Sequence, residues 1–556
     1  MARRIALFCL ALGLNVGLHA QTPTAVTHEQ VDRVFARWDK TDSPGCALAV
    51  LQNSGPVYEH GYGMADLEHN APITPGTPFH VASISKQFTA AAILLLAKQR
   101  KLSLDDDVRK YIPELHDFGV SIRIRHLLHH TSGLRDQWDL LGLAGWRYSL
   151  DLITDADVMS LVYRQRDLNF PPGSKYLYSN TGYTVLAQIV QRTSGQSLRE
   201  FTTKNIFEPL GMKSTHFRDD HAEIIKGEGL GYVPAPHNTF RLSVTNFDTV
   251  GATSLYTTVQ DLAKWDENFY SPKIGGPDFA PLMTQTEKLT TGKDNTYALG
   301  LVLGNYRGLP IAGHSGADAG YRSNMVRFPQ QHFSVVTLCN TPTMPGLLNL
   351  AVADLYLAAQ FKTPPPAIPN LQDSVRLPQD RIGGKSGFYL LRDIGVVMKI
   401  GSENGTLQVV EDDDRNPLAT DGKGHFTLPY STSVGHFEPA DGNAQLFIVE
   451  PLTGPSDIWD RLPDFTLPPG AEREYAGSYF SDELDVTYRI EESGEKLVLK
   501  RKKYPDQVLT AVGHDLFTAR VGFSMSALEF ERDSSGRISG MSLTTGRVLH
   551  LKFSRH

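Results

Sequence analysis

Apolar residues follow two different patterns along the chain, and the change between them falls near residue 360. Before that point, apolar stretches long enough for helices alternate with short strand-like stretches. One of them, Phe88 to Ala97, is too short to cross a bilayer and predicts a helix buried in a core. After residue 360 the apolar runs are short, rich in β-branched and aromatic residues, and separated by Gly, Asp and Asn. This part of the chain therefore predicts strands joined by tight turns.

Two proline-rich segments divide the chain. The segment KTPPPAIP at 362–369 has stiff backbone with few hydrogen-bond donors, which favours a linker. A second pair, Pro468 and Pro469, interrupts the β-rich part. The predicted organisation is an α+β domain over residues 21–362, a linker over 363–369, and two β domains over 370–467 and 468–556.

The two β domains resemble each other. GFYLLRDIGVVMKI, which begins at Gly387, aligns with GSYFSDELDVTYRI, which begins at Gly477, 90 residues later (477 against 387). HFTLPY at His425 aligns with LFTARV at Leu516, an offset of 91 (516 against 425). The repeat predicts a duplicated antiparallel barrel. A single β-sandwich spanning both segments is the alternative, and the intervening proline pair argues against it.

The first twenty residues have the pattern of a secretion signal. Arg3 and Arg4 precede an apolar run from Ile5 to Leu18, and a cleavage site follows Ala20. A membrane anchor is the alternative, but the apolar run is short for a span. We therefore expect cleavage after residue 20, an exported protein in the periplasm or outside the cell, and no stable membrane span afterwards.

Charge and cysteine content indicate which partners and how many disulfides to expect. The chain has 556 residues, with 54 Lys and Arg against 61 Asp and Glu, a net charge of −7. No basic field favours a nucleic-acid partner. Only Cys46 and Cys339 lie beyond the predicted signal, which is no disulfide framework. The sequence does not decide whether the two cysteines form a disulfide, and we favour two buried thiols.

The chemistry that stands out begins at the predicted buried helix. Ser83 and Lys86 are one helical turn apart at its start. A serine hydroxyl becomes a nucleophile when a base removes its proton, and a desolvated lysine with a lowered pKa can be that base. The spacing alone is a weak signal, because Ser493 and Lys496 repeat it in a polar turn.

Two further motifs follow in the chain. YLYSNTGY contains Tyr178 and Asn180, a phenol that can shuttle a proton beside a lysine and an amide that can hold a substrate amide. The alternative is a tyrosine packed under a turn, with Asn180 capping the next helix. AGHSGADAG contains His314, Ser315 and Gly316, and the N–H of Ala317 after them can point at a carbonyl oxygen.

In this order, the three motifs resemble those of the penicillin-recognising serine hydrolases, most closely the class C β-lactamase-like branch. The flanking phrases IRIRHLLHHTSGL, FPPGSKYLYSNTGY and GATSLYTTVQDLAKW resemble the same branch. The resemblance covers roughly Val26 to Gln360. It implies an antiparallel sheet packed against helices, with an all-helical subdomain carrying the tyrosine motif.

The resemblance also implies a role for each motif residue. Ser83 would be acylated, and Lys86 and Tyr178 would transfer protons. Asn180 would contact the substrate, and His314, Ser315 and Gly316 would line the opposite wall. The N–H groups of Ser83 and Ala317 would form the oxyanion hole. No cofactor or metal is implied, and the expected partner is a small molecule or short peptide.

The third motif departs from the β-lactamase pattern. His314 stands where β-lactamases have a lysine that can hold a substrate carboxylate, and a histidine is mostly neutral at pH 7. Members with His-x-Gly resemble peptidases, D-aminopeptidases and esterases. The appended lipocalin-like barrels are similar to those of the D-amino-acid-specific peptidases, and that arrangement implies that a barrel loop borders the active site. We expect a hydrolase of D-amino-acid-containing peptides or cell-wall fragments. The alternatives are a carboxylesterase or weak β-lactamase, and a non-catalytic penicillin-binding-like sensor.

Two other patterns attract less weight. The sequence GKSG at 384–387 imitates the third motif, but it falls at a repeat position of the β domains, so structure explains it. His126, His129 and His130 have helical spacing that suits zinc, yet no carboxylate or cysteine cluster accompanies them. We expect a structural role for these histidines.

Overall fold

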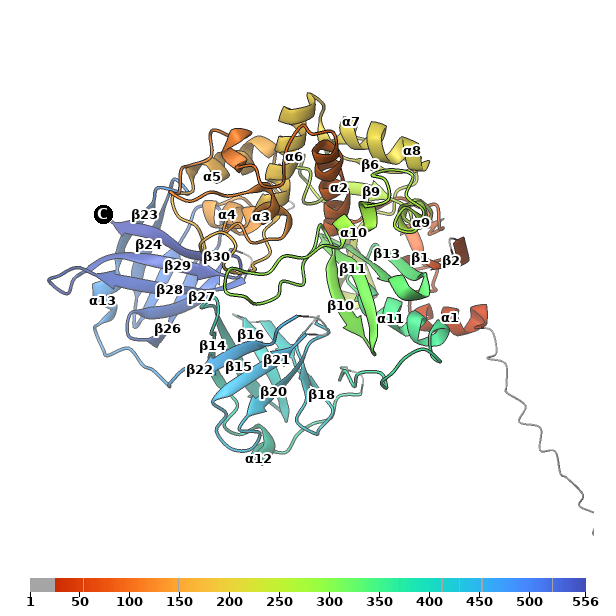
Figure 1. The fold of residues 1–556 in the computed structure, drawn as a ribbon. Coiled ribbons are helices and arrows are strands. Elements are labelled where there is room, and N and C mark those ends of the chain that lie inside the picture. The colour runs from red at the N-terminus through yellow and green to blue at the C-terminus, as the bar shows by residue number, and fades with distance from the viewer. Residues whose placement is uncertain are drawn as a thin grey trace, which may run out of the picture.

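The computed structural model describes residues 26–556 except 54, 149, 370, 372, 412–413, 430, 452–453 and 523. The predicted signal segment lies outside the described residues. Figure 1 shows an N-terminal domain of helices around a sheet, with two β-barrels beside it. The predicted fold class, an α+β domain followed by two antiparallel barrels, is confirmed.

The N-terminal domain is built on a six-stranded antiparallel sheet in which the two ends of the domain meet. Its order is β10-β11-β12-β13-β1-β2, so the first strand lies beside the last one. Alternate residues of β1 face opposite cores: Ala47 and Ala49 pack toward the helices around α2, whereas Leu48 and Val50 pack toward α1 and α11. The strands are β1 Cys46–Gln52, β2 Gly55–Tyr62, β10 Val302–Tyr306, β11 Leu309–Asp318, β12 Tyr321–Phe328 and β13 Phe333–Cys339.

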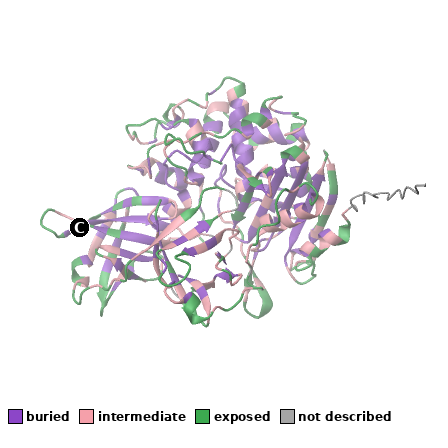
Figure 2. Ribbon diagram, turned by 60° about the horizontal axis from the view of Figure 1, so that its bottom comes forward, coloured by how far each residue is buried: buried purple, intermediate pink, exposed green. Residues whose placement is uncertain are grey.

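Helices cover both faces of this sheet. The central one, α2, is buried along nearly its whole length, as its apolar sequence predicts, and Figure 2 shows the buried interior continuing through helices and sheet. The helices are α1 His28–Phe35, α2 Ser85–Lys98, α3 Ile124–Leu128, α4 Gln137–Ala144, α5 Asp155–Arg164, α6 Asn180–Ser194, α7 Leu198–Thr202, α8 Glu208–Leu210, α9 Val259–Glu267, α10 Phe279–Met283 and α11 Pro345–Tyr356. Within the described residues, no helix has the length and hydropathy needed to cross a membrane.

The segment 362–369 has neither helix nor strand, and barrel 1 follows it after the short helix α12 Gln379–Ile382. Barrel 1 is a nine-stranded sheet that curls without closing, because β17 and β18 remain at its two edges. Its strands are β14 Gly387–Leu391, β15 Val397–Glu403, β16 Thr406–Glu411, β17 Asp414–Pro417, β18 Ala419–Thr420, β19 Phe426–Thr427, β20 Val434–Glu438, β21 Leu446–Glu450 and β22 Asp457–Arg461.

Barrel 2 is closed and repeats the first barrel in detail. Tyr389 lies opposite Arg461 in barrel 1, and Tyr479 lies opposite Arg555 in barrel 2. Each tyrosine hydroxyl donates to the carbonyl four residues before it, at 2.8 Å and 2.7 Å. The strands of barrel 2 are β23 Gly477–Ser481, β24 Val486–Ser493, β25 Lys496–Lys500, β26 Gln507–Gly513, β27 Leu516–Val521, β28 Ser524–Arg532, β29 Ile538–Thr545 and β30 Val548–Arg555, preceded by α13 Glu472–Tyr475.

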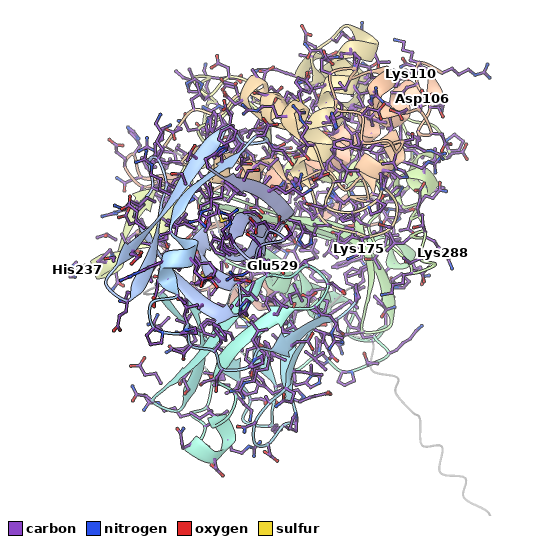
Figure 3. All side chains as sticks on the ribbon, turned by 90° about the vertical axis from the view of Figure 1, so that its left-hand side faces the viewer. Asp106, Lys110, Lys175, His237, Lys288 and Glu529 are labelled. Atoms are coloured by element: carbon purple, nitrogen blue, oxygen red, sulfur yellow. A yellow bond between two sulfur atoms is a disulfide. The ribbon has the colours of Figure 1, made fainter. Side chains whose placement is uncertain are left out.

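The barrels are docked on the N-terminal domain and on each other. Lys175, labelled near the centre of Figure 3, donates to the carbonyl of Asp393 in barrel 1 at 3.3 Å. Tyr488 of barrel 2 donates to the carbonyl of Leu143 at 2.7 Å. The interior of barrel 2 and the core of the N-terminal domain form one continuous apolar cluster. Such an interface favours a fixed arrangement over free domain motion.

The two remaining cysteines are bridged, so the preference for buried thiols is wrong. Cys46 and Cys339 lie directly opposite each other on β1 and β13, with their sulfur atoms 2.10 Å apart. Sequence could not place these residues together, because 293 positions separate them and only the closing of the sheet makes them neighbours. The bridge therefore ties the first strand of the sheet to the last one.

Replacing both cysteines with alanine should lower the free energy of unfolding of the N-terminal domain by about 2 to 5 kcal/mol. The bridge closes a very long loop, so its loss frees much of the unfolded chain. Urea unfolding followed by tryptophan fluorescence measures this change. A reductant should shift the midpoint of the wild-type protein toward that of the double variant and leave the variant unchanged. Equal midpoints for the two proteins without reductant would contradict the prediction.

Candidate active site

Ser83 lies in a short 3₁₀ turn, η1 Ala82–Ile84, that leads directly into α2. Strand β5 (Phe79–His80), which pairs with β9 (Leu255–Thr257), delivers the chain to this turn. Ala82 has a φ of +46°, a left-handed conformation that is uncommon for a residue with a side chain. The N-cap position of α2 is Ile84, and no side-chain hydrogen bond caps the helix there. The side chain of Ser83 is partly exposed, whereas those of its neighbours are buried, which leaves the hydroxyl accessible.

Lys86 lies beneath Ser83 with no exposed surface. Its ammonium nitrogen is 3.0 Å from Ser83 Oγ, 2.9 Å from Asn180 Oδ1 and 2.6 Å from the carbonyl oxygen of Ala252. Burial lowers the pKa of Lys86 well below its ordinary value, and the negative charge of Asp136 opposes that shift in part. In the neutral amine, two hydrogens can bond to the two acceptors. The lone pair then faces the Ser83 hydroxyl.

Tyr178 lies on the other side of the lysine, with its ring centroid 4.9 Å from Lys86 Nζ. Its buried hydroxyl has no hydrogen bond of ordinary geometry to any residue that the structure describes. Burial raises the pKa of the phenol above its usual value, while the Ser83 hydroxyl and the Arg547 charge oppose that rise by smaller amounts. A lysine ammonium nearby would make a phenol lose its proton more easily, but the burial of Tyr178 outweighs that effect. Tyr178 is therefore a neutral phenol at neutral pH, and it can donate a proton.

Asn180 begins α6 and is held at both ends of its amide. Its Oδ1 accepts from Lys86, and its Nδ2 donates to Asp136 Oδ2 at 2.8 Å. The sequence argument expected this amide to contact the substrate. In this structure both ends of the amide bond within the protein, and Asn180 positions the lysine.

Asp136 is a functional residue that the sequence argument missed. It has no exposed surface, and its Oδ2 accepts from the backbone N–H of Asn180 at 2.6 Å as well as from the side chain. Its Oδ1 accepts from Trp138 N, so the same carboxylate caps α4. A signal was present, since an aspartate preceding an apolar helix predicts a cap. Nothing in the sequence pointed from that cap to Asn180, 44 residues later.

His314 is neutral and has both ring nitrogens engaged. Its Nδ1 lies 2.5 Å from the carbonyl oxygen of Ser315, which requires a donor there, so its Nε2 accepts from the Tyr297 hydroxyl at 2.9 Å. Burial, together with the charge of Lys86, lowers the pKa of His314 to about 3. The third motif thus carries no positive charge near neutral pH.

The other residues of the third motif divide between two sides of β11. Gly316 packs so closely that an added Cβ would lie 2.2 Å from the carbonyl oxygen of Val81, so only glycine fits beside the turn that carries Ser83. This contact brings the Ala317 backbone toward Ser83. Ser315 does not join the cluster: its hydroxyl accepts from Asn324 at 2.8 Å, on the side of the strand away from His314.

Two of the three histidines, His129 and His130, pack beside the site. His130 stacks on Tyr178 with ring centroids 4.2 Å apart, and its Nδ1 accepts from the N–H of Ser179 at 3.1 Å. His129 contacts the carbonyl oxygen of Tyr297 at 2.9 Å. Among the described residues, one group has ligand atoms close enough for a metal ion, Asp220, His221 and Asp248, and it includes none of the predicted site residues.

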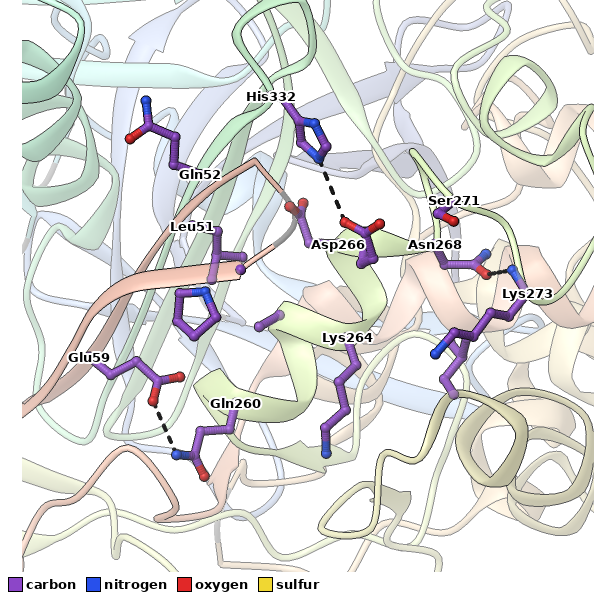
Figure 4. Close-up of a pocket in the computed structure, with 15 residues that line it drawn as sticks. Leu51, Gln52, Glu59, Gln260, Lys264, Asp266, Asn268, Ser271, Lys273 and His332 are labelled. Carbon is purple, nitrogen blue, oxygen red and sulfur yellow. Dashed lines mark hydrogen bonds and ion pairs between the residues drawn. The ribbon is translucent and has the colours of Figure 1, made fainter.

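A cation reaches this site from barrel 2. Arg547, in the turn between β29 and β30, has its guanidinium carbon 4.9 Å from the centroid of the Tyr178 ring. Its Nη1 lies 4.0 Å from Asp136 Oδ2. A surface hollow beside α9, drawn in Figure 4 with Lys264, Asp266 and His332, contains none of the predicted site residues. Ser83, and not that hollow, marks the candidate active site.

These features define a serine hydrolase domain with a buried lysine. The beta-lactamase family profile matches residues 31–360, more than half of the chain, and the protein belongs to the beta-lactamase family. The resemblance inferred from the motifs is thereby confirmed. The distant relatives are D-aminopeptidases, which makes this chain a beta-lactamase-family hydrolase related to them.

Three comparisons describe these relations. A D-aminopeptidase of Brucella anthropi is 25% identical over 539 residues, covering 92% of this chain and 95% of the relative. A D-aminopeptidase of Gluconobacter oxydans is 30% identical over 298 residues, covering 53% of this chain and 56% of the relative. The structure of an octameric penicillin-binding protein homologue from Pyrococcus abyssi has a TM-score of 0.56 and 21% identity, covering 78% of this chain and 99% of that one. This last likeness concerns the fold alone.

Changing Asp136 to Asn should slow hydrolysis about 10- to 100-fold and move the acid limb of the pH–rate profile to lower pH. The slower rate follows from a lost charged hydrogen bond to Asn180. The shift follows because the Asp136 charge raises the pKa of Lys86, so its removal lowers that pKa further, and the base is then neutral at lower pH.

Initial rates on a chromogenic ester across the pH range measure both effects. Asp157→Asn is the matched control, because Asp157 lies in the capping box of α5 without touching the site. A lost cap costs about 1 kcal/mol of stability. If both variants lost activity equally and neither profile moved, Asp136 would have only a capping role.

Proposed function

We propose that this protein is an exported serine hydrolase that cleaves amide bonds in short peptides containing D-amino acids, including cell-wall fragments, through an acyl-enzyme on Ser83. The observation that carries the proposal is the contact of Lys86 Nζ with Ser83 Oγ at 3.0 Å, in which the lysine has no exposed surface. The relationship to D-aminopeptidases supports the choice of substrate. The Cys46–Cys339 bridge fits a protein outside the cytoplasm.

The acylation step uses the buried lysine as the base. Neutral Lys86 takes the proton of Ser83 while Oγ attacks the substrate carbonyl carbon and the carbonyl oxygen becomes an oxyanion. Asn180 Oδ1 and the Ala252 carbonyl hold the amine so that its lone pair faces Oγ. These acceptors also stabilise the ammonium that forms, so the charge created in the transition state does not remain unpaired.

Tyr178 is suited to the second proton transfer. As a neutral phenol it gives its proton to the leaving nitrogen and recovers one from Lys86. The bond between carbon and nitrogen breaks, and the ester on Ser83 remains. Water then attacks this ester, with the same groups removing its proton, and the product carboxylic acid leaves. Every proton in these steps moves between Ser83, Lys86, Tyr178, water and the substrate, so the proposed steps use no metal or cofactor.

The oxyanion hole would be formed by the N–H groups of Ser83 and Ala317. The close contact of Gly316 with the turn before Ser83 draws these two backbone segments together. Residues 314–318 of β11 lie beyond the end of its pairing with β10, and no other described strand covers that edge. An extended peptide substrate can pair with this edge and align its carbonyl with Ser83.

Ser83→Ala should abolish labelling by a fluorophosphonate probe, because Oγ is the atom that the probe modifies. Intact mass and peptide mapping after incubation locate the added mass, which should lie on the peptide that contains Ser83. Ser493→Ala is the matched control, because Ser493 at the end of β24 has the same spacing to Lys496, which begins β25 of barrel 2. Labelling that persists in the Ser83 variant would contradict the assignment.

Turnover should be fastest on peptides with D-amino acids. A side-by-side comparison would use D-aminoacyl anilides, D-Ala-D-Ala peptides, a chromogenic cephalosporin and short acyl esters, with Ser83→Ala as the blank. We expect D-peptides to exceed the cephalosporin in kcat/KM, because His314 is neutral and offers no cation to a β-lactam carboxylate at the usual position. Rapid turnover of the cephalosporin alone would contradict the preference for peptides.

A further inference from the structure

The turn between β29 and β30 brings a backbone-anchored arginine into the active site. The Arg547 carbonyl accepts from the N–H of Asp136 at 3.2 Å and from Asn169 Nδ2 at 3.0 Å. The Arg547 N–H donates to Asp139 Oδ2 at 3.0 Å. Three bonds thus fix the backbone of this one residue against the loop that holds Asn180 and Lys86. The position of Arg547 is therefore set by docking of the barrel.

A buried ion pair also holds barrel 2 on the N-terminal domain, at the residue before Asp136. Arg135 bonds to Glu483 of barrel 2 at 2.8 Å, and their side chains are 1% and 8% exposed. Arg135 also donates to the Leu549 carbonyl in β30 at 3.2 Å. A buried charge pair of this kind favours one arrangement of the two domains, because separating it would leave an uncompensated charge.

The Arg547 side chain, in contrast, has its donors unused. It makes no hydrogen bond to any side chain or carbonyl in the described part of the protein, and its nearest acidic oxygen, on Asp136, is 4.0 Å away. That oxygen already accepts two bonds from Asn180. The side chain is 43% exposed, so a ligand can reach it. A guanidinium presents five N–H donors in a planar fork that matches a carboxylate.

The third motif cannot supply this charge. His314 has its Nδ1 bonded to a carbonyl and its Nε2 bonded to Tyr297, so it has no free donor for a substrate. Arg547 reaches the same cluster over the ring of Tyr178. A cation in this position attracts an anionic group near the scissile bond and repels an ammonium.

We propose that Arg547 is the specificity residue of this site and binds a free carboxylate close to the scissile carbonyl, such as the C-terminal carboxylate of a D-dipeptide. This inference rests on the proposed function of Ser83. An enzyme with this residue recognises the free carboxylate of its substrate and not a free α-amino group. The preferred substrate is then a peptide cleaved next to its carboxyl end.

The test compares two substrates that differ only in this charge, N-acetyl-D-Ala-D-Ala and its C-terminal carboxamide, with the full-length protein. The wild type should cleave the acid with a kcat/KM at least about tenfold higher. Arg547→Gln should lower kcat/KM for the acid about 10- to 100-fold and change that for the amide less than about threefold, the range for one charged hydrogen bond. Arg547→Lys should recover part of the loss, because it keeps the charge without the fork.

Arg473→Gln is the matched control. Arg473 also belongs to barrel 2, its side chain is 80% exposed, and Figure 1 draws its helix α13 far from α2. This variant should leave both rates unchanged. Equal losses on acid and amide in Arg547→Gln, or no loss on either, would overturn the proposal. If a variant fails to fold, equal kcat/KM values of the wild type for acid and amide would still overturn the proposal.

Fluorophosphonate labelling of Ser83 separates this inference from the proposed function. If the wild type is not labelled, the proposed function fails and the inference fails with it. If Ser83 is labelled but neither peptide is cleaved, acylation by benzylpenicillin and by its methyl ester provides the same comparison of acid with neutral analogue. Faster acylation by the acid that Arg547→Gln removes supports the proposal. Equal rates with the two agents overturn it.

Discussion

The structure around Ser83 depends on the burial of one amine. Lys86 has no exposed surface, and an ammonium taken out of water costs several kcal/mol unless its environment replaces the lost hydration. The protein meets this cost in part with three oxygen contacts and with the charge of Asp136. The remaining desolvation lowers the pKa of Lys86, and this lowering is what makes the residue a base. The burial that makes Lys86 costly to accommodate is therefore also what gives it its function as a base.

Several distant parts of the chain are needed to hold that amine. Lys86 comes from α2, Asn180 from α6, and the Ala252 carbonyl from the segment before β9. Asp136 orients Asn180, and the turn of barrel 2 holds the backbone of Asp136. Barrel 2 is therefore part of the support of the active site. The continuous apolar cluster between barrel and N-terminal domain agrees with this dependence, because neither surface is suited to exposure.

The sheet also joins distant segments. Strand β1 precedes Ser83, and β13 follows the third motif, yet they are neighbours with seven residue pairs in register, including the bridged cysteines. This closure fixes β11 and β12 relative to α2. Ser323 on β12 donates to the Val81 carbonyl at 2.8 Å, so the sheet directly holds the turn that carries the nucleophile.

Much of the fold was predictable from local pattern. The apolar run Phe88–Ala97 predicted the buried helix, and the spacing of Ser83 and Lys86 predicted their contact, because helical geometry places residues three apart side by side. The repeats at Gly387 and Gly477 predicted two barrels. Short-range periodicity predicts these elements because the side chains of a helix or a strand repeat along the chain with a fixed period.

The charges and partners of the site were decided by tertiary structure. The protonation of His314 and Tyr178, the engagement of Asn180, and the pairing of Cys46 with Cys339 depend on burial and on atoms far away in sequence. Asp136 and Arg547 belong to none of the three motifs. Asp136 reaches Asn180 only through the folding of the N-terminal domain, and Arg547 reaches the site only when barrel 2 docks on that domain. Sequence determined which reactive groups and elements exist. Only the folded chain set the distances between them, on which electrostatic energies depend.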